Sequence, residues 1–101
     1  MTRTPAAVAT ALTAKGMVPD ESHHTMYRKS IDGVTTLVTR ISHGADTIGD
    51  DLGKRMANQC CLQLKEFWRL VDCHLSEADW DALVRSRCVG GHNPFMRPGA
   101  R

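Results

Sequence analysis

Histidine is the residue type in this chain best suited to proton-transfer chemistry, and three histidines cluster around one predicted turn. The five are His23, His24, His43, His74 and His92. Asp32 and Gly33 predict the tight turn of a β-hairpin, because both central positions of such a turn favour positive φ. His24 and His43 lie at similar distances on either side of it. We therefore expect them to be neighbours at the open end of the hairpin.

Two neighbouring histidines can carry acid–base catalysis without a metal. The unperturbed pKa of histidine lies near neutrality, so one ring can accept a proton while another donates one at pH 7. Cleavage of RNA needs such a base for the 2′-hydroxyl and such an acid for the leaving oxygen. Adjacent residues on a strand point to opposite faces, so only one of His23 and His24 can share a face with His43. Ser22 and Ser42 precede these sites and could hydrogen-bond phosphate, but histidines at strand ends can equally be surface residues without a task.

The elements that must position these residues predict an α+β fold. The order is a helix, an antiparallel β-hairpin (or a three-stranded sheet), and two or three further helices. Thr4 followed by Pro5 predicts the start of a helix over residues 5–15, which Gly16 ends. Pro19 and the acidic residues after it are expected to form a polar loop.

Strands are predicted over residues 25–30 and 34–41. The first alternates bulky and polar side chains, and the second is rich in Val, Thr and Ile, as strands prefer. Leu37, Thr39 and Ile41 share one face of the second strand. We expect one of its two faces to pack on helices.

Three amphipathic segments follow, beginning near Asp50, after Leu62 and at Ser76, which resembles a helix cap. Their apolar positions are Leu52, Met56 and Cys60; Leu64, Phe67, Leu70 and Val71; and Trp80, Leu83 and Val84. We expect one domain over residues 1–85, with a flexible tail over residues 86–101.

Composition limits the function classes only loosely. The 101 residues, with a hydrophobic fraction of 42% and a charged fraction of 24%, are typical of one small soluble domain. No apolar run is long enough to span a bilayer, and no export signal is evident, so a cytoplasmic location is expected. The net charge of +2 is too small to indicate a nucleic-acid partner by itself.

The four cysteines form no CxxC pair and lack the spacing of a zinc site, so no metal or other cofactor is predicted. Thiols stay reduced in the cytosol, so disulfides are not expected. Cys60 and Cys73 are predicted to be small core residues.

Two runs of sequence resemble the HicA toxins, a family of small RNA-binding proteins. In KGMVPDESHHTMYR a lysine–glycine ends the first helix, and a loop leads to a strand similar to the family's Gly-Ser-x-His. In RISHGADTIGDDLGKRMANQCCLQLKEF a strand ends in His-Gly, and a turn and a leucine- and lysine-containing helix follow, with Glu66 and Phe67 in the next short helix. The resemblance covers about residues 10–71.

The resemblance implies a fold related to the double-stranded-RNA-binding domain. Family members are ribonucleases that act on messenger RNA and are blocked by a HicB antitoxin. The family's catalytic histidine matches His24, and its His-Gly matches His43 and Gly44. On this interpretation His24 and His43 are catalytic, and the residues expected to contact RNA are Ser22, His23, Arg28, Lys29, Arg40 and Lys54.

The chain departs from the family pattern in ways that favour a second hypothesis. Glu21 replaces the glycine before the serine, Gln63 stands where a Ser or Thr cap is usual, and a further helix carries Trp80. The alternative is a non-catalytic module that binds RNA or a protein partner. A third interpretation is a dimer with Trp68 or Trp80 at its seam.

Overall fold

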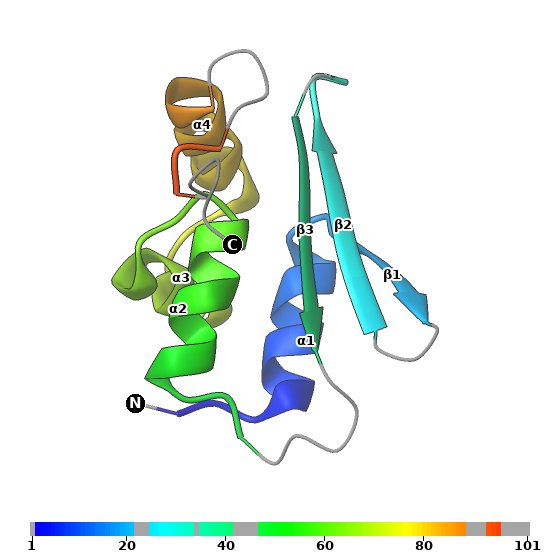
Figure 1. The fold of residues 1–101 in the computed structure, drawn as a ribbon, viewed down its shortest axis with the longest axis vertical. Helices are drawn as coiled ribbons and strands as arrows, with labels where there is room; N and C mark the ends of the chain where they lie inside the picture. Colours follow the sequence, from blue (N-terminus) through cyan, green and yellow to red (C-terminus); the bar gives the residue numbers. More distant parts are fainter. Residues whose placement is uncertain (1, 22–24, 34, 42–46, 89–92, 96–101) are drawn as a thin grey trace.

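One layer of helices packs on one face of a three-stranded antiparallel sheet in the computed structural model, so the fold is α+β as predicted (Figure 1). The structure describes residues 2–21, 25–33, 35–41, 47–88 and 93–95. The elements are α1 (Pro5–Ala14), β1 (Val18–Glu21), β2 (Thr25–Ile31), β3 (Thr35–Ile41), α2 (Asp50–Gln59), α3 (Leu64–Val71) and α4 (Glu77–Arg87). None of the helices in the described ranges is long and apolar enough to cross a membrane.

Helix α1 begins and ends where its sequence predicts. The Thr4 hydroxyl accepts a hydrogen bond of 3.1 Å from the Ala7 N–H, which satisfies one of the free donors at the helix start. Gly16 follows the helix at φ +96°, a conformation that an L-residue with a side chain rarely adopts. Val8 and Leu12 are buried against the rest of the core.

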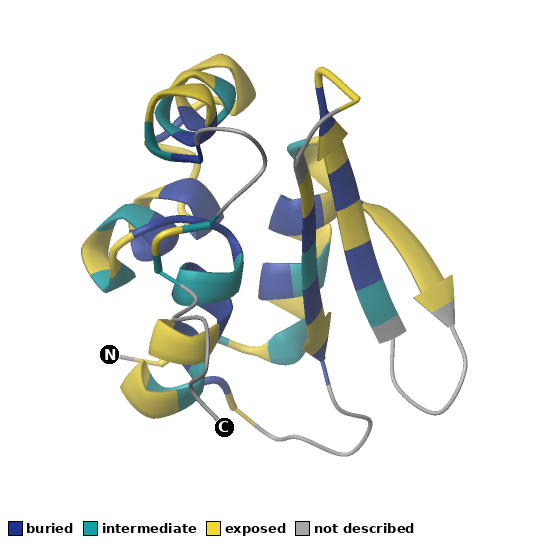
Figure 2. Ribbon diagram, turned by 45° about the horizontal axis from the view of Figure 1, so that its top comes forward, coloured by how far each residue is buried: buried dark blue, intermediate teal, exposed yellow. Residues whose placement is uncertain are grey.

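The predicted hairpin is confirmed. Asp32 and Gly33 form its turn with φ values of 57° and 69°. On β3, Leu37, Thr39 and Ile41 are buried. Buried and exposed positions also alternate along β2 (Figure 2). The two-residue period of the strand therefore separates a buried face from an exposed one.

A third strand stands where a polar loop was expected, so the three-stranded alternative is the correct one. Strand β1 pairs antiparallel with β2 from Val18↔Arg28 to Glu21↔Thr25. Local propensity gave no clear sign of it, because Pro19, Asp20 and Glu21 are residue types depleted in strands. Pro19 is tolerated because β1 is an edge strand, where a missing N–H need not interrupt a ladder.

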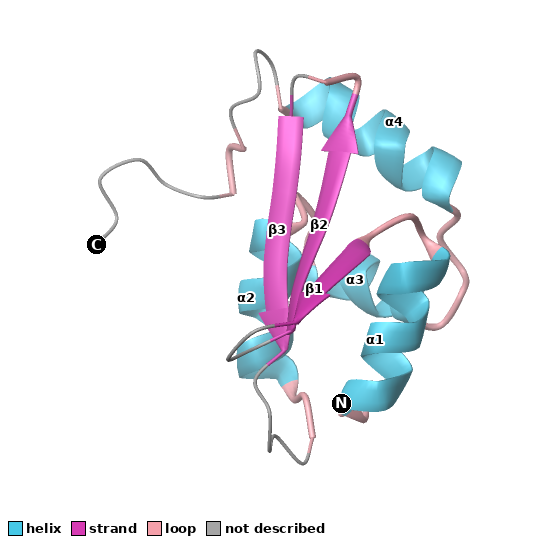
Figure 3. Cartoon of the chain, turned by 90° about the vertical axis from the view of Figure 1, so that its right-hand side faces the viewer, coloured by secondary structure: helices cyan, strands magenta, loops and turns pink. Residues whose placement is uncertain are grey.

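The later helices lie as predicted, but the C-terminal boundary differs. Helix α4 continues to Arg87, two residues beyond the expected end, and Cys88 after it is buried. Figure 3 shows the helices, α4 included, behind the sheet. Asn93 donates a 2.8 Å hydrogen bond to the Asn58 carbonyl, and Phe95 packs against the core. Residues 86–88 and 93–95 are thus part of the fold rather than of a flexible tail.

Two other side-chain predictions are corrected. Cys60 is buried as expected, whereas Cys73 is exposed in the turn after α3. Trp68 and Trp80 are both buried, so neither can anchor a dimer seam. Trp68 packs so closely on α2 that a Cβ on Gly53 would lie 2.6 Å from its ring.

Lys29 is a buried cation at the centre of the helix-covered face. Its ammonium lies 2.7 Å from Glu77 Oε2, 3.3 Å from Asp81 Oδ1 and 3.1 Å from the Lys15 carbonyl oxygen. It also lies 5.3 Å from the centre of the Trp80 ring. A buried charge is tolerated only when it is paired and hydrogen-bonded, and these contacts join β2 to α4.

We predict that Lys29→Ala lowers the free energy of unfolding by about 2–3 kcal/mol, because it leaves acidic groups of α4 without their cation. Arg28→Ala, on the exposed face of the same strand, should change it by less than about 0.5 kcal/mol. Urea unfolding at pH 7 measures both. Equal losses for the two variants would contradict the assignment of Lys29 as the cation that joins the sheet to α4.

A second ion pair holds the end of α4 against α3. Arg87 donates to both carboxylate oxygens of Glu66, at 2.8 and 2.9 Å, and the Gln63 N–H donates to Glu66 at 2.7 Å. These donors, Arg87 above all, lower the pKa of Glu66 from its ordinary value of 4.5. Because the folded-state pKa is depressed, the pair stabilises the fold above about pH 4.5 and loses that effect as the pH falls further.

We therefore expect Glu66→Gln to lower the free energy of unfolding by about 1–2 kcal/mol at pH 7. The difference from wild type should shrink as the pH falls below about 4.5. Asp32→Asn is the matched control, because it breaks an ion pair with Arg85 whose two side chains are each 54% exposed. Such a solvent-exposed pair contributes little, so this variant should unfold at nearly the same denaturant concentration as wild type. Denaturant titrations from pH 3 to 7 test both, and a constant Glu66→Gln difference would be inconsistent with the ion pair.

Candidate nucleic-acid interface

The face of the sheet that points away from the helices is polar and accessible. We call it the open sheet face. Its described side chains are Val18, Asp20, Met26, Arg28, Ser30, Thr36, Val38 and Arg40. All are exposed except Met26 and Val38, which are half-buried (Figure 2).

Two of the predicted RNA-binding residues, Arg28 and Arg40, lie on the open sheet face. The register pairs Arg28 with Val38 and Met26 with Arg40, so the two arginines are diagonal neighbours on adjacent strands. No described carboxylate lies within ion-pair distance of either guanidinium. Their positive charge is therefore available to a ligand, although Asp20 shares the face and partly offsets it.

Arg40 also lines a small cleft between β3 and α2, which we call the Arg40–Arg55 cleft. It encloses about 220 Å³ and is lined by Arg40, Leu52, Arg55, Met56 and Gln59. The Thr39 hydroxyl donates a 2.6 Å hydrogen bond to Gln59 Oε1, which holds that amide in place. Two guanidinium groups and an amide over apolar side chains suit an anion of the size of a phosphate group.

The sequence prediction missed Arg55 and Gln59 as site residues. They are four positions apart on α2 and so lie on one side of the helix. The sequence shows this four-residue spacing, but it does not show that this side of α2 contacts β3. The predicted Lys54 is exposed on the same helix, and within the described chain it also has no carboxylate partner.

The structure places Lys29 differently from the prediction. An RNA-binding role was expected, but its side chain is only 5% exposed and its ammonium is paired with Glu77 and Asp81. The reason is strand alternation, since Arg28 and Lys29 are adjacent and must point to opposite faces. Lys29 therefore serves the fold and is not accessible to phosphate.

The histidine prediction is not tested by the structure. Ser22, His23, His24 and His43 lie outside the described residues. What is described is the register, in which Thr25 pairs with Ile41 at the open end of the hairpin. Arg40, which pairs with Met26, lies next to that end.

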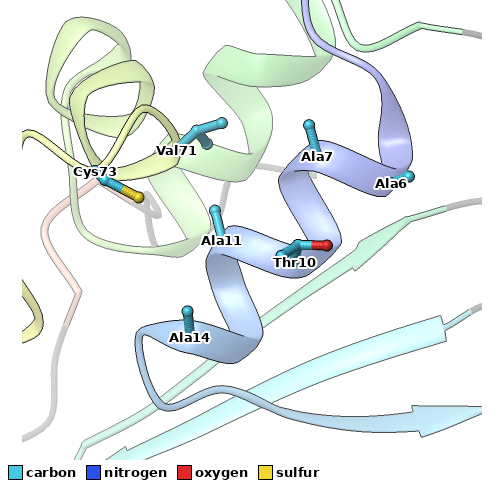
Figure 4. Close-up of a pocket in the computed structure, with 7 residues that line it drawn as sticks. All are labelled: Ala6, Ala7, Thr10, Ala11, Ala14, Val71 and Cys73. Atoms are coloured by element: carbon cyan, nitrogen blue, oxygen red, sulfur yellow. The ribbon is translucent and has the colours of Figure 1, made fainter.

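A second hollow lies on the helix side, between α1 and the end of α3 (Figure 4). It encloses about 400 Å³, and alanines of α1 form most of its wall. Among its described lining residues, Thr10 and Cys73 are the polar ones, and Val71 adds apolar surface. None of the lining residues that the structure describes is charged, so they do not suit phosphate binding. Across the described ranges, His, Cys, Asp and Glu also form no group of three that could hold a metal ion.

Comparison with known proteins gives no information about the function. No family model, no curated protein and no solved structure matches the chain.

Proposed function

We propose that this protein is a cytoplasmic RNA-binding protein of the HicA type that cleaves messenger RNA without a metal. His24 would act as the general base or acid, and His43 would assist it. The observation that carries the proposal is the position of Arg40. It lies beside the open end of the hairpin, where Thr25 directly follows His24 in sequence and pairs with Ile41, and it lines the same cleft as Arg55.

This placement supports backbone binding next to a site of proton transfer. A phosphate bound by Arg40 and Arg55 would be held near the hairpin end by two charge-assisted contacts. One histidine would remove the proton from a 2′-hydroxyl, whose oxygen then attacks the adjacent phosphorus. The other would protonate the leaving 5′-oxygen. The guanidinium groups would stabilise the charge that develops on the phosphoryl oxygens.

The open sheet face favours contacts with the RNA backbone over contacts with bases. Sequence-specific binding of single-stranded RNA commonly uses aromatic side chains on which bases stack. Among the described residues, none on this face is aromatic, because Tyr27 points into the core. Arg28, Arg40, Lys54 and Arg55 instead offer cations for phosphates, so we expect salt-sensitive binding with little sequence preference.

Arg40→Ala should reduce the salt dependence of RNA binding. Each phosphate contact to a single strand adds about −0.7 to the slope of log affinity against log salt concentration. The variant should therefore bind more weakly at low salt, with a slope shallower by about 0.7. Fluorescence anisotropy with a labelled 2′-O-methyl oligonucleotide measures this without cleavage, because the nucleophilic hydroxyl is blocked.

Arg69→Ala is the matched control, because Arg69 is an exposed arginine on α3 in the helix layer. It removes the same charge and should leave the slope close to that of wild type. A similar loss for both variants would indicate that net charge alone governs binding, and would argue against the Arg40–Arg55 cleft as the contact site.

The catalytic part of the proposal predicts that wild-type protein cleaves messenger RNA in EDTA and that His24→Ala does not. His74→Ala, which removes an exposed histidine between α3 and α4, should cleave as wild type does. Gel analysis of a long transcript reports cleavage, and circular dichroism shows whether each variant is folded. Equal cleavage by folded His24→Ala and wild type would refute the assignment.

A non-catalytic module is the second candidate. Asp20 on the open sheet face and the burial of Lys29 favour it, because both reduce the positive charge available to RNA. Binding without cleavage would support an RNA-binding module. Absence of both would favour a protein partner, such as a HicB-like antitoxin.

A further inference from the structure

Two buried cysteines from distant parts of the chain meet at the end of α4. Cys61 lies in the turn between α2 and α3, and Cys88 follows α4. Their Sγ atoms are 2.7 Å apart, within about 1 Å of a covalent S–S bond length. Their sequence separation hides this contact, because 26 residues, including all of α3 and α4, lie between them.

Backbone contacts hold both residues in this position. Cys61 has φ 62°, and its N–H donates to the Asn58 carbonyl oxygen at 3.1 Å. The Cys88 N–H donates to the Val84 carbonyl oxygen at 2.7 Å. The backbone that carries each thiol is therefore held in place by hydrogen bonds of its own.

Arg87, the residue before Cys88, also contacts Cys61. Its Nη1 donates a 3.1 Å hydrogen bond to the Cys61 carbonyl oxygen while the guanidinium pairs with Glu66. The guanidinium carbon also lies 5.4 Å from the centre of the Phe95 ring. Arg87 is thus hydrogen-bonded directly to Cys61. Moving Cys88 away from Cys61 would disturb this hydrogen bond, the ion pair with Glu66 and the contact with Phe95.

We propose that Cys61 and Cys88 are a site of reversible oxidation that forms an intramolecular disulfide when the protein meets hydrogen peroxide. One thiolate attacks the peroxide, so the O–O bond breaks, hydroxide leaves and the sulfur becomes a sulfenic acid. The second thiol then attacks this sulfur, the S–S bond forms and water leaves. In total two thiols and one peroxide give one disulfide and two waters.

Burial limits which oxidants can reach the two thiols and how fast the disulfide forms. Cys61 is fully buried and Cys88 is 4% exposed, so a small oxidant suits the site. Burial, with help from the nearby Cys88, raises the pKa of Cys61 to about 12, so at neutral pH its reactive thiolate is scarce. We expect formation over minutes to hours, and rapid capture of any sulfenic acid by the neighbouring thiol.

The test uses the full chain with Cys73→Ser, which removes the exposed thiol and leaves three cysteines. The protein is treated with hydrogen peroxide, unfolded, and labelled with N-ethylmaleimide. Intact mass should show one label instead of three, with the disulfide accounting for a loss of about 2 Da. Trypsin should then release a linked pair of peptides, residues 56–65 and 88–101, which dithiothreitol separates.

Residues 56–65 contain both Cys60 and Cys61, so a further variant is needed to distinguish them. Adding Cys60→Ser should keep the link, and adding Cys88→Ser should abolish it. Three maleimide labels after peroxide treatment would overturn the proposal, as would sulfinic acid at these thiols without a link, or loss of the link in Cys60→Ser. The mapping in the parent protein does not depend on the folding of a Cys61 or Cys88 variant.

Discussion

The packing of α4 against the sheet depends on Lys29, a charged residue on the buried face of β2. A lysine on the inner face of β2 requires anionic partners, and α4 supplies them with the half-exposed Glu77 and the more buried Asp81. Gly16 fits the same constraint, because a Cβ there would collide with Glu77 and lie 2.7 Å from the Lys29 ammonium. The contact therefore couples the end of α1, the middle of β2 and the start of α4.

The same combination of a cation, an aromatic ring and a carboxylate recurs at three places on the helix side. Arg3 pairs with Asp72 beside Trp68, Lys29 with Glu77 beside Trp80, and Arg87 with Glu66 beside Phe95; these contacts fasten the N-terminal segment, the sheet and the end of α4. Trp80 also donates a 2.9 Å hydrogen bond to the Cys60 carbonyl oxygen, which draws α4 against the turn between α2 and α3. The helix α4 is thus integral to the fold, and it brings Cys88 to Cys61.

Local signals predicted much of this fold, and contacts between distant segments account for what they missed. The cap at Thr4, the turn at Asp32–Gly33 and the alternation along β3 depend on neighbours in sequence, and each was predicted correctly. Strand β1 is formed by pairing with β2, which its own residues do not indicate. The Arg40–Arg55 cleft depends on packing of α2 against β3, and the burial of Lys29 depends on α4. None of these three contacts has a signature within a short window of sequence.

The distribution of charge bears more directly on function than its sum does. A net charge of +2 gives no strong indication of nucleic-acid binding. Yet Arg3, Lys29 and Arg87 are neutralised on the helix side, whereas Arg28, Arg40, Lys54 and Arg55 lack carboxylate partners throughout the described ranges. Of these, Arg40 and Arg55 line one cleft where β3 meets α2, and this local pair of cations would attract an anion although Asp50 and Asp51 begin the same helix. Because the helix layer covers the other face of the sheet, the RNA of our proposal would bind at this edge and on the open sheet face.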